Sequence, residues 1–568
     1  MRLQHRSVAL LASVAGVALV ATACGGSSGS GAKAGATKGP GDTGVKALDI
    51  NAQPRDKLAD GGTLRWPIDQ ISTQWNYNQL DGPNVATSDV MLSLMPAPMV
   101  SDEKAVVTPD PNYVTSAKVT STSPQVITYV LNPKAKWSDG TPITVQDYEA
   151  QWNALNGKNP AFLVASTTGY ELVSSVKAGR DDHEVVVTFA EPFSDWQSLF
   201  SPLYPASQQS TPQAFNTGFL NKIPVTAGPF KLSKIDQTQK SVTVVRDPNW
   251  WGDKAKLDTI VFRSMDQTAS IQAFANNELD IVNIGANAEG FKQASGVTGG
   301  AVREAAGPDY RHFTFNATSP MLSDPAVRRA IAQAINRSAI AQSDLNGLNW
   351  PAKTMDNHFF VNSQQGYQDN SGDVGKYAPD KAKAALDAAG WKVNGQFRQK
   401  DGKTLDLKFV IPSGVARAKS EAELTQAMLS DVGVKLTIQA VPSDAFFGKY
   451  VNVGNFDMTP FSWIGTPFAI SSAKSIYQNP TKDGKGQLAI QQNYARVGSP
   501  EIDALLQAAS SELDVAKARD QINQADKLVW DEVHSLILYQ RPQIYGSRAN
   551  LANVGAFGFK SPKYEDIG

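Results

Sequence analysis

The chain is poor in the residues on which several classes of protein depend. Of its 568 residues only one is a cysteine, Cys24, so no disulfide can form within the chain and the fold depends on its hydrophobic core. An excess of one charge is also lacking, because 53 Lys and Arg residues stand against 54 Asp and Glu residues. This balance excludes a nucleic-acid partner bound through a broad basic surface. A chain of this length is expected to fold into more than one lobe.

Sequence motifs of catalysis are missing or misplaced. The pattern G-x-S-x-G occurs at residues 25–29 and G-x-G-x-x-G at residues 39–44, both in a glycine-rich stretch. A nucleophile elbow or a phosphate-binding loop must follow a strand and open a helix, so neither match carries that function. No H-E-x-x-H or C-x-x-C motif occurs. The five histidines are widely separated: His5, His183, His312, His358 and His534.

These absences predict a protein that is not an enzyme and that holds neither a metal nor a cofactor. A pair among the many carboxylates could still serve glycoside hydrolysis, although no pair stands out in the sequence. A secreted α/β hydrolase therefore remains a less favoured alternative.

The N-terminal residues read as an export signal. Two arginines precede an uncharged apolar run at residues 8–20, which is shorter than the roughly 18 residues that span a bilayer. The small residues before Cys24 resemble the bacterial lipobox, with Ala21 where Leu is common. This resemblance implies removal of residues 1–23, lipid attachment at Cys24 and anchoring to the outer face of the cell membrane. Residues 24–60, rich in Gly, Ser and Ala, are predicted to form a flexible tether.

Beyond this tether the pattern is that of a mixed α/β protein. Residues 125–131 and 184–189 alternate apolar and polar side chains and are predicted to be half-buried strands. Helices are predicted to begin at Ser323-Asp324-Pro325, to run from about 379 to 390, and to lie within 514–532. Each carries an apolar stripe, which we expect to face the core.

A series of short segments carries the strongest signal in the chain: Trp137-Ser138-Asp139-Gly140-Thr141-Pro142, Gly228-Pro229-Phe230, Arg246-Asp247-Pro248-Asn249-Trp250-Trp251-Gly252, Asn277-Glu278-Leu279-Asp280-Ile281, Val327-Arg328-Arg329-Ala330, and Asp380 through Trp391. In this order they resemble the signatures of the family 5 solute-binding proteins, which are the oligopeptide, dipeptide and nickel-chelate receptors of ABC importers. The resemblance extends from about Gly61 to the C-terminus.

The resemblance implies an α/β fold of the bilobal, Venus-flytrap type (class II or cluster C) with an extra inserted domain. Residues 61–97, 219–310 and 541–568 would form lobe I, and residues 311–540 lobe II. Residues 98–218 would form the inserted domain. The chain would cross twice between the lobes, and these crossings would act as a hinge that closes on the ligand.

The resemblance also indicates where the ligand binds. Peptide receptors of this family meet the α-amino group of the ligand with an Asp in a segment W-x-G-D, and the similar segment here contains Trp463, Gly465, Thr466 and Phe468. Trp463 is predicted to form a flat apolar wall, and Thr466 stands where the Asp is expected. Loss of a hydrogen bond to a charged group would weaken binding of a free amino terminus about 10- to 100-fold. Two nearby acids are alternative partners: Asp444 and Asp457.

Two further ligand contacts are predicted outside this segment. Asn84 follows Gly82-Pro83 in a loop that resembles the edge of lobe I facing the peptide, and its amide can both donate and accept. Tyr539 lies at the end of the last apolar strand and would close the pocket from the hinge.

Together these features predict an extracytoplasmic, lipid-anchored, monomeric receptor. It would capture oligopeptides or peptide-like solutes and deliver them to the permease and ATPase subunits of an ABC importer. Thr466 leaves a second ligand class open, in which the same fold binds a metal chelate, an opine or an oligosaccharide. A sensor of signalling peptides is a further alternative.

Overall fold

The computed structural model describes residues 45–443, 445–482 and 488–568. The predicted signal peptide, Cys24 and Asp444 lie outside these residues. Within the described ranges, no helix is both long enough and apolar enough to cross a membrane. Residues 45–60 differ from the predicted tether, because Ile50 and Leu58 are buried and Asp49 pairs with Ala556 near the C-terminus. The packed part of the chain therefore begins before residue 61.

The first sheet has four strands in the order β1 (Thr63–Ile68), β10 (Thr259–Ser264), β9 (Ser241–Arg246) and β8 (Phe230–Asp236). β1 and β10 are parallel, and the other neighbours are antiparallel. After β1 the chain leaves this sheet, and it returns to the sheet only at β8.

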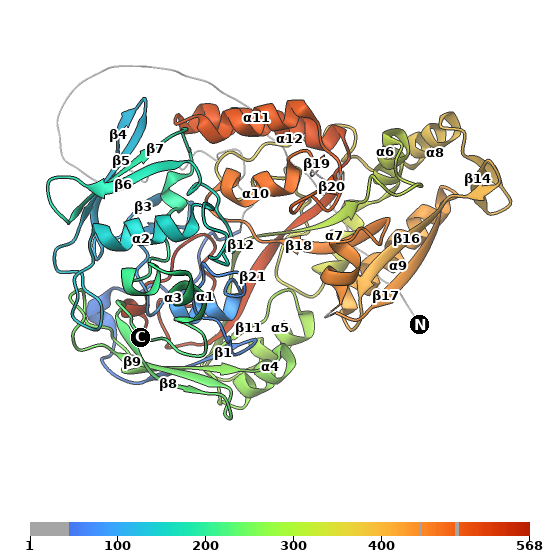
Figure 1. The fold of residues 1–568 in the computed structure, drawn as a ribbon. Coiled ribbons are helices and arrows are strands. Elements are labelled where there is room, and N and C mark those ends of the chain that lie inside the picture. The colour runs from blue at the N-terminus through green and yellow to red at the C-terminus, as the bar shows by residue number, and fades with distance from the viewer. Residues whose placement is uncertain (1–44, 444, 483–487) are drawn as a thin grey trace, which may run out of the picture. The chain divides into compact units, whose positions relative to one another are not determined.

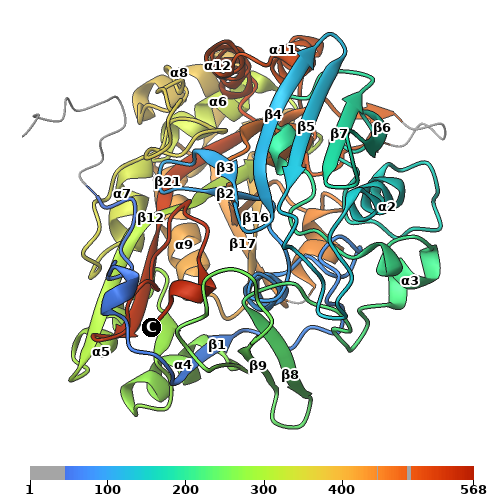
Figure 2. The ribbon, with the colours of Figure 1, turned by 90° about the vertical axis from the view of Figure 1, so that its left-hand side faces the viewer.

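The chain between β1 and β8 contains a second four-stranded sheet, in the order β4 (Val114–Thr122), β5 (Gln125–Leu131), β7 (Glu184–Phe189) and β6 (Val173–Ala178) (Figure 2). The two strands predicted from alternation are β5 and β7, which are antiparallel neighbours with alternating burial. A short hairpin of β2 (Met99–Ser101) and β3 (Val107–Pro109) precedes them.

A six-stranded sheet connects the two halves of the described chain (Figure 1). Its strands follow the order β11 (Ile281–Asn283), β21 (Ser535–Arg548), β12 (Gly300–Phe315), β18 (Met458–Trp463), β16 (Asp406–Pro412) and β17 (Lys435–Val441). Two smaller sheets complete the strands: β13 (Lys392–Asn394), β14 (Phe397–Lys400) and β15 (Lys403–Thr404), and β19 (Thr481–Lys482) with β20 (Leu488–Ala489).

The long antiparallel pair β12 and β21 passes from one hydrophobic core to another. Phe313 of β12 belongs to a core built from residues 310–436 and 458–559, whereas Tyr545 of β21 packs against a core built from residues 64–281 and 551–567. The register between the two strands shifts between Ala306 and Tyr310. Both chain crossings therefore lie side by side, with an irregular segment of β12 between the cores.

The helices have these bounds: α1 Val85–Met91, α2 Val145–Leu155, α3 Pro212–Thr217, α4 Gln267–Ala275, α5 Ala288–Ser295, α6 Pro325–Ala334, α7 Arg337–Asp344, α8 Pro379–Ala388, α9 Ala416–Asp431, α10 Ala469–Tyr477, α11 Pro500–Ser511 and α12 Val515–Asp531. The three predicted helices are α6, α8 and α12. Asp324 caps α6 at the predicted start, and Asp514 caps α12, because each carboxylate accepts a backbone N–H of the first turn.

Candidate functional site

The segment after β18 meets the irregular part of β12. A Cβ atom at Gly465 would overlap the carbonyl oxygen of Pro308, so only glycine allows the two backbones to come this close. Trp463 is the last residue of β18 and pairs with Tyr310 of β12. The ligand segment predicted from the sequence therefore lies against the crossing between the two cores.

Trp463 is part-buried in a cluster of rings. Its indole lies parallel to Tyr494, at 5.8 Å between ring centroids, and to His312, at 6.0 Å. Phe461 packs edge-on against it at 5.2 Å. These contacts fix the orientation of the Trp463 ring, as a rigid ligand wall requires. Its role as that wall stays a prediction.

Thr466 is exposed, and its hydroxyl is used locally. The oxygen accepts a hydrogen bond from the backbone N–H of Phe468 at 3.1 Å, and the hydroxyl donates to the carbonyl of Phe468 at 3.2 Å. These bonds shape the turn that leads into α10. The side chain that replaces the expected Asp thus shapes the loop and offers no charge to a ligand.

Phe468 reaches a cavity of about 300 Å³ beside this loop. Its walls include Pro467 and Phe468 of this loop, residues of α1 and residues near the C-terminus. Much of the remaining wall is aromatic or sulfur-containing: Tyr77, Met91, Met95, Met99, Tyr113, Trp250 and Tyr564. We call this space the loop cavity. Sequence patterns did not indicate it, because its walls come from segments several hundred residues apart.

Asn84 caps α1. Its side-chain oxygen accepts from the backbone N–H of Thr87 at 2.8 Å, and its amide nitrogen donates to the carbonyl of Gly82 at 3.1 Å. Both polar atoms of the predicted ligand contact are thus engaged in holding the loop and the helix together.

Tyr539 is buried within β21 beside a group of charged residues at the crossing. Its hydroxyl donates to Asp344 at 2.9 Å, and Arg311 forms a buried ion pair with Glu421, with Nε and Oε1 2.7 Å apart. Burial, together with the charge and hydrogen bond of the neighbouring Glu421, raises the pKa of Asp344 to about 8. A ligand would reach Tyr539 only if this group rearranged.

Asp457, one of the two alternative acids, is held within the fold. Its carboxylate accepts hydrogen bonds from the Ser319 hydroxyl and, at 2.6 Å, from the backbone N–H of Lys408. These contacts tie β16 to the start of β18, and they leave Asp457 poorly placed to replace the acid missing at Thr466.

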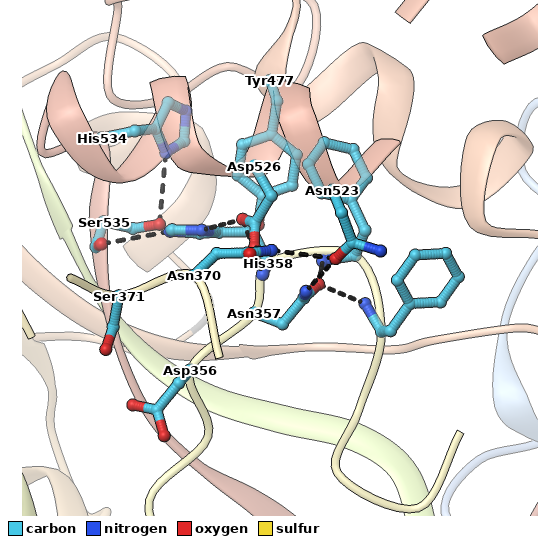
Figure 3. A network of polar contacts seen from close by, with 12 residues as sticks. Asp356, Asn357, His358, Asn370, Ser371, Tyr477, Asn523, Asp526, His534 and Ser535 are labelled. Carbon is cyan, nitrogen blue, oxygen red and sulfur yellow. Dashed lines mark hydrogen bonds and ion pairs between the residues drawn. The ribbon is translucent and has the colours of Figure 1, made fainter. Parts of the chain in front are cut away.

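A buried polar network lies between residues 354–372, α12 and β21 (Figure 3). The Nδ1 atom of His358 lies 2.7 Å from the carboxylate of Asp526, and Nε2 lies 3.2 Å from the carbonyl of Ser535. Asn370 donates to the other oxygen of Asp526 at 2.7 Å. Burial lowers the pKa of nearby His534 to about 3, so this ring is neutral at physiological pH. The network anchors residues 354–372 to the second core.

His312, His358 and His534 are buried, and their rings form hydrogen bonds within the fold. Within residues 45–443, 445–482 and 488–568, no group of three or more His, Cys, Asp or Glu residues is arranged to hold a metal ion. The region around Trp463 and Phe468 instead combines a loop packed closely against β12, an aromatic cavity, and the paired strands β12 and β21.

Several known proteins are similar to this chain in sequence. A family model described as "Bacterial extracellular solute-binding proteins, family 5 Middle" matches residues 108–485. The oligopeptide-binding protein OppA of Mycobacterium tuberculosis is 40% identical over 524 residues, which cover 92% of this chain and 87% of OppA. A probable monoacyl phosphatidylinositol tetramannoside-binding protein, LpqW, of the same species is 30% identical over 41% of the chain.

Solved structures give the same result. The periplasmic EDTA-binding protein EppA superposes with a TM-score of 0.83 at 26% identity, covering 92% of this chain and 98% of EppA. AppA from Bacillus subtilis, in complex with a nonapeptide, superposes with a TM-score of 0.73 at 20% identity, covering 90% and 99%. The fold class expected from the short segments, a bilobal α/β binding protein with an inserted domain, is confirmed. The chain belongs to family 5 of the bacterial extracellular solute-binding proteins.

Proposed function

We propose that this protein is the substrate receptor of an ABC importer and that its substrates are oligopeptides. It captures a peptide between lobe I and lobe II and presents it to a membrane permease powered by a separate ATPase. Similarity to OppA over most of both chains supports the substrate class. The loop cavity is the single structural observation that carries the proposal.

The loop cavity suits a receptor that accepts many peptide side chains. Three of its wall residues are Met91, Met95 and Met99, and methionine fills irregular space because its side chain is unbranched and flexible. The rings of Tyr113 and Trp250 add flat apolar surface. A wall of this kind discriminates weakly between side chains, which leaves affinity to contacts with the peptide backbone.

The division into lobes follows the same proposal. Residues 61–97, 219–310 and 541–568 form lobe I, residues 311–540 lobe II, and residues 98–218 the inserted domain, which shares a continuous core with lobe I. The paired crossings β12 and β21 act as the hinge, since they pass between the two large cores and carry the register shift. Trp463, Gly465 and Phe468 contact the ligand from the lobe II side.

A thermal-shift titration tests the substrate class. The mature domain is incubated with random peptide pools of defined length and, separately, with free amino acids and oligosaccharides. The proposal expects a rise in melting temperature with at least one peptide pool, since a ligand at 100 times its Kd stabilises by about 2.7 kcal/mol. Absence of a shift with every peptide pool would overturn the peptide assignment.

A chelate or another non-peptide solute is the second candidate. Thr466 offers no carboxylate to a free amino terminus, and EppA, whose structure is similar, binds EDTA. A shift with EDTA or its metal complexes, and with no peptide pool, would favour this candidate and keep the receptor role.

A further inference from the structure

Two carboxylates from distant parts of the chain line the loop cavity. Asp110 follows β3, and Glu565 lies in a short 3-10 helix, Tyr564–Asp566, near the C-terminus. Both lie close enough to Tyr113, another wall residue, for their charges to raise the pKa of its hydroxyl, after burial as the main cause. The two acids therefore converge on one end of the cavity.

Neither carboxylate has a cationic partner within ion-pair distance among the described residues. One oxygen of Asp110 accepts from the backbone N–H of Asn112 at 2.9 Å, and the side chain of Glu565 receives no hydrogen bond from another residue of the described chain. By contrast Asp566, the next residue, pairs with Arg55 at 2.6 Å. Lys563 also lines the cavity; its exposed side chain forms no ion pair with either acid, although its charge lowers the pKa of both. The acids face the cavity with unused acceptor capacity.

The aromatic wall beside the acids adds to this arrangement. Trp250 packs against Tyr113, with 5.7 Å between ring centroids, and against Trp251 at 4.2 Å. Ring faces attract cations. Acids and rings together fit an ammonium group.

The loop cavity lies next to the loop that carries Thr466. Thr466 carries no charge, and Phe468, two residues further on, forms part of the cavity wall. The same cavity therefore carries two acids from elsewhere in the chain, Asp110 from residues 98–218 and Glu565 from residues 541–568.

We propose that Asp110 and Glu565 bind the primary ammonium group of the ligand, with Trp250 and Tyr113 as its aromatic wall. This inference rests on the proposed function and names the chemical class of ligand: peptides that present an ammonium group, at the amino terminus or on a lysine side chain, to the end of the loop cavity.

Three synthetic probes separate these sources. One pentapeptide is used with a free amino terminus, with an acetylated terminus, and with an acetylated terminus and a lysine in place of the first residue. Affinities for the mature domain are measured by calorimetry with the wild-type protein, Asp110→Asn, Glu565→Gln and the double variant. Asp253→Asn, which changes an exposed acid away from the cavity, is the matched control.

In the wild-type protein and in Asp253→Asn, acetylation is expected to weaken binding about tenfold or more, as for a lost charge-assisted hydrogen bond. In the double variant the free peptide binds as weakly as the acetylated one, so the effect of acetylation disappears. Recovery of affinity with the lysine probe, lost again in the double variant, would assign the subsite to lysine side chains.

Equal loss on acetylation in the wild-type protein and in the double variant would overturn this inference and leave the receptor function intact. So would equal binding of free and acetylated peptide to the wild-type protein. If the wild-type protein binds none of the three probes and no peptide pool, the proposed function itself fails. Melting temperatures of the ligand-free variants, expected to match or exceed that of the wild-type protein, exclude misfolding as a cause of lost binding.

Discussion

The carboxylate of Asp195 accepts a hydrogen bond from the backbone N–H of Ser471, with the two atoms 2.7 Å apart. Asp195 belongs to residues 98–218, and Ser471 lies in the first turn of α10, directly after the loop of Trp463 and Phe468. A second bond, from the N–H of Ser194 to the carbonyl of Ser510 at 2.7 Å, runs beside it. Residues 98–218 are therefore fastened to α10, the helix that follows the loop of Trp463 and Phe468.

Removing this carboxylate should weaken the contact between residues 98–218 and α10. An acid at a helix N-terminus satisfies a backbone donor and interacts favourably with the helix dipole. For Asp195→Ala we expect an affinity for peptide about tenfold lower than wild type, and for Asp195→Asn, which keeps an acceptor, a smaller loss. Calorimetry with one peptide measures both. Wild-type affinity in Asp195→Ala would show that this contact does not take part in closure.

Gly465→Ala should displace the ligand loop. The added methyl group meets the backbone carbonyl of Pro308, which cannot move without disturbing β12. Peptide affinity is expected to fall at least about tenfold, while the protein remains folded. Gly448→Ala is the matched control, because a Cβ there would meet nothing within 4 Å. Equal affinities for the two variants would mean that the loop position does not matter for binding.

Asp526→Ala should destabilise the protein without changing what it binds. The substitution leaves the ring of His358 and the amide of Asn370 without their buried acceptor, and breaking a buried pair costs about 3–5 kcal/mol. Urea denaturation measures this loss. Asp531→Asn, at the exposed end of the same helix, should change stability by less than about 1 kcal/mol. A stability of Asp526→Ala close to wild type would contradict the structural role of the network.

Glu565 makes stability and binding depend on pH. Burial raises its pKa to about 7, with the charges of Asp566 and Asp110 adding to the shift, whereas the ordinary value is 4.5. The folded protein thus keeps a proton that the unfolded chain has lost, so the stability due to this group is greatest below pH 4.5 and declines as the pH rises to about 7. Glu565→Gln should be more stable than wild type at pH 8, by up to about 3 kcal/mol, with no difference at pH 4. Chemical denaturation at the two pH values measures this.

The same proton should leave when an ammonium group binds. A cation beside Glu565 favours its charged form, so binding at neutral pH releases a proton into the buffer. Calorimetry in buffers of different ionisation enthalpy would detect the release in the wild-type protein, and Glu565→Gln should lose it. Proton release that is unchanged in Glu565→Gln would assign it to another group.

Lipid attachment at Cys24 is a prediction from the sequence, and Cys24 lies outside the described residues. Cys24→Ala should leave the precursor unmodified and unanchored, so that the protein appears outside the membrane fraction of the producing cells. Fractionation and intact-mass measurement check this, with a serine changed in the same segment, Ser28→Ala, as control. An equal membrane share for Cys24→Ala and wild type would contradict the anchor.

Local patterns predicted much of the fold. Alternation located β5 and β7, Ser323-Asp324-Pro325 located the start of α6, and an apolar stripe located α12, because these signals depend on residues close together in sequence. The bond between Asp49 and Ala556 could not be predicted in this way, which is why residues 45–60 were expected to be free.

The candidate site likewise has a part that the sequence predicted and a part that it did not. The segment of Trp463 was found from its motif, and the structure gives Gly465 a steric reason. The convergence of Asp110 with Glu565 had no signal in the sequence, because the two acids are separated by most of the chain and meet only through the packing of the inserted domain on the C-terminal residues. The hydrogen bond between Thr466 and Phe468 could not be predicted either, because it depends on the conformation of the loop.

Native mass spectrometry of the mature domain, purified without denaturation, tests the central claim most directly. The account predicts that short peptides with free amino termini co-purify and can be released and sequenced. A single non-peptide mass, present in place of peptides, would contradict the assignment of this family 5 receptor to oligopeptides.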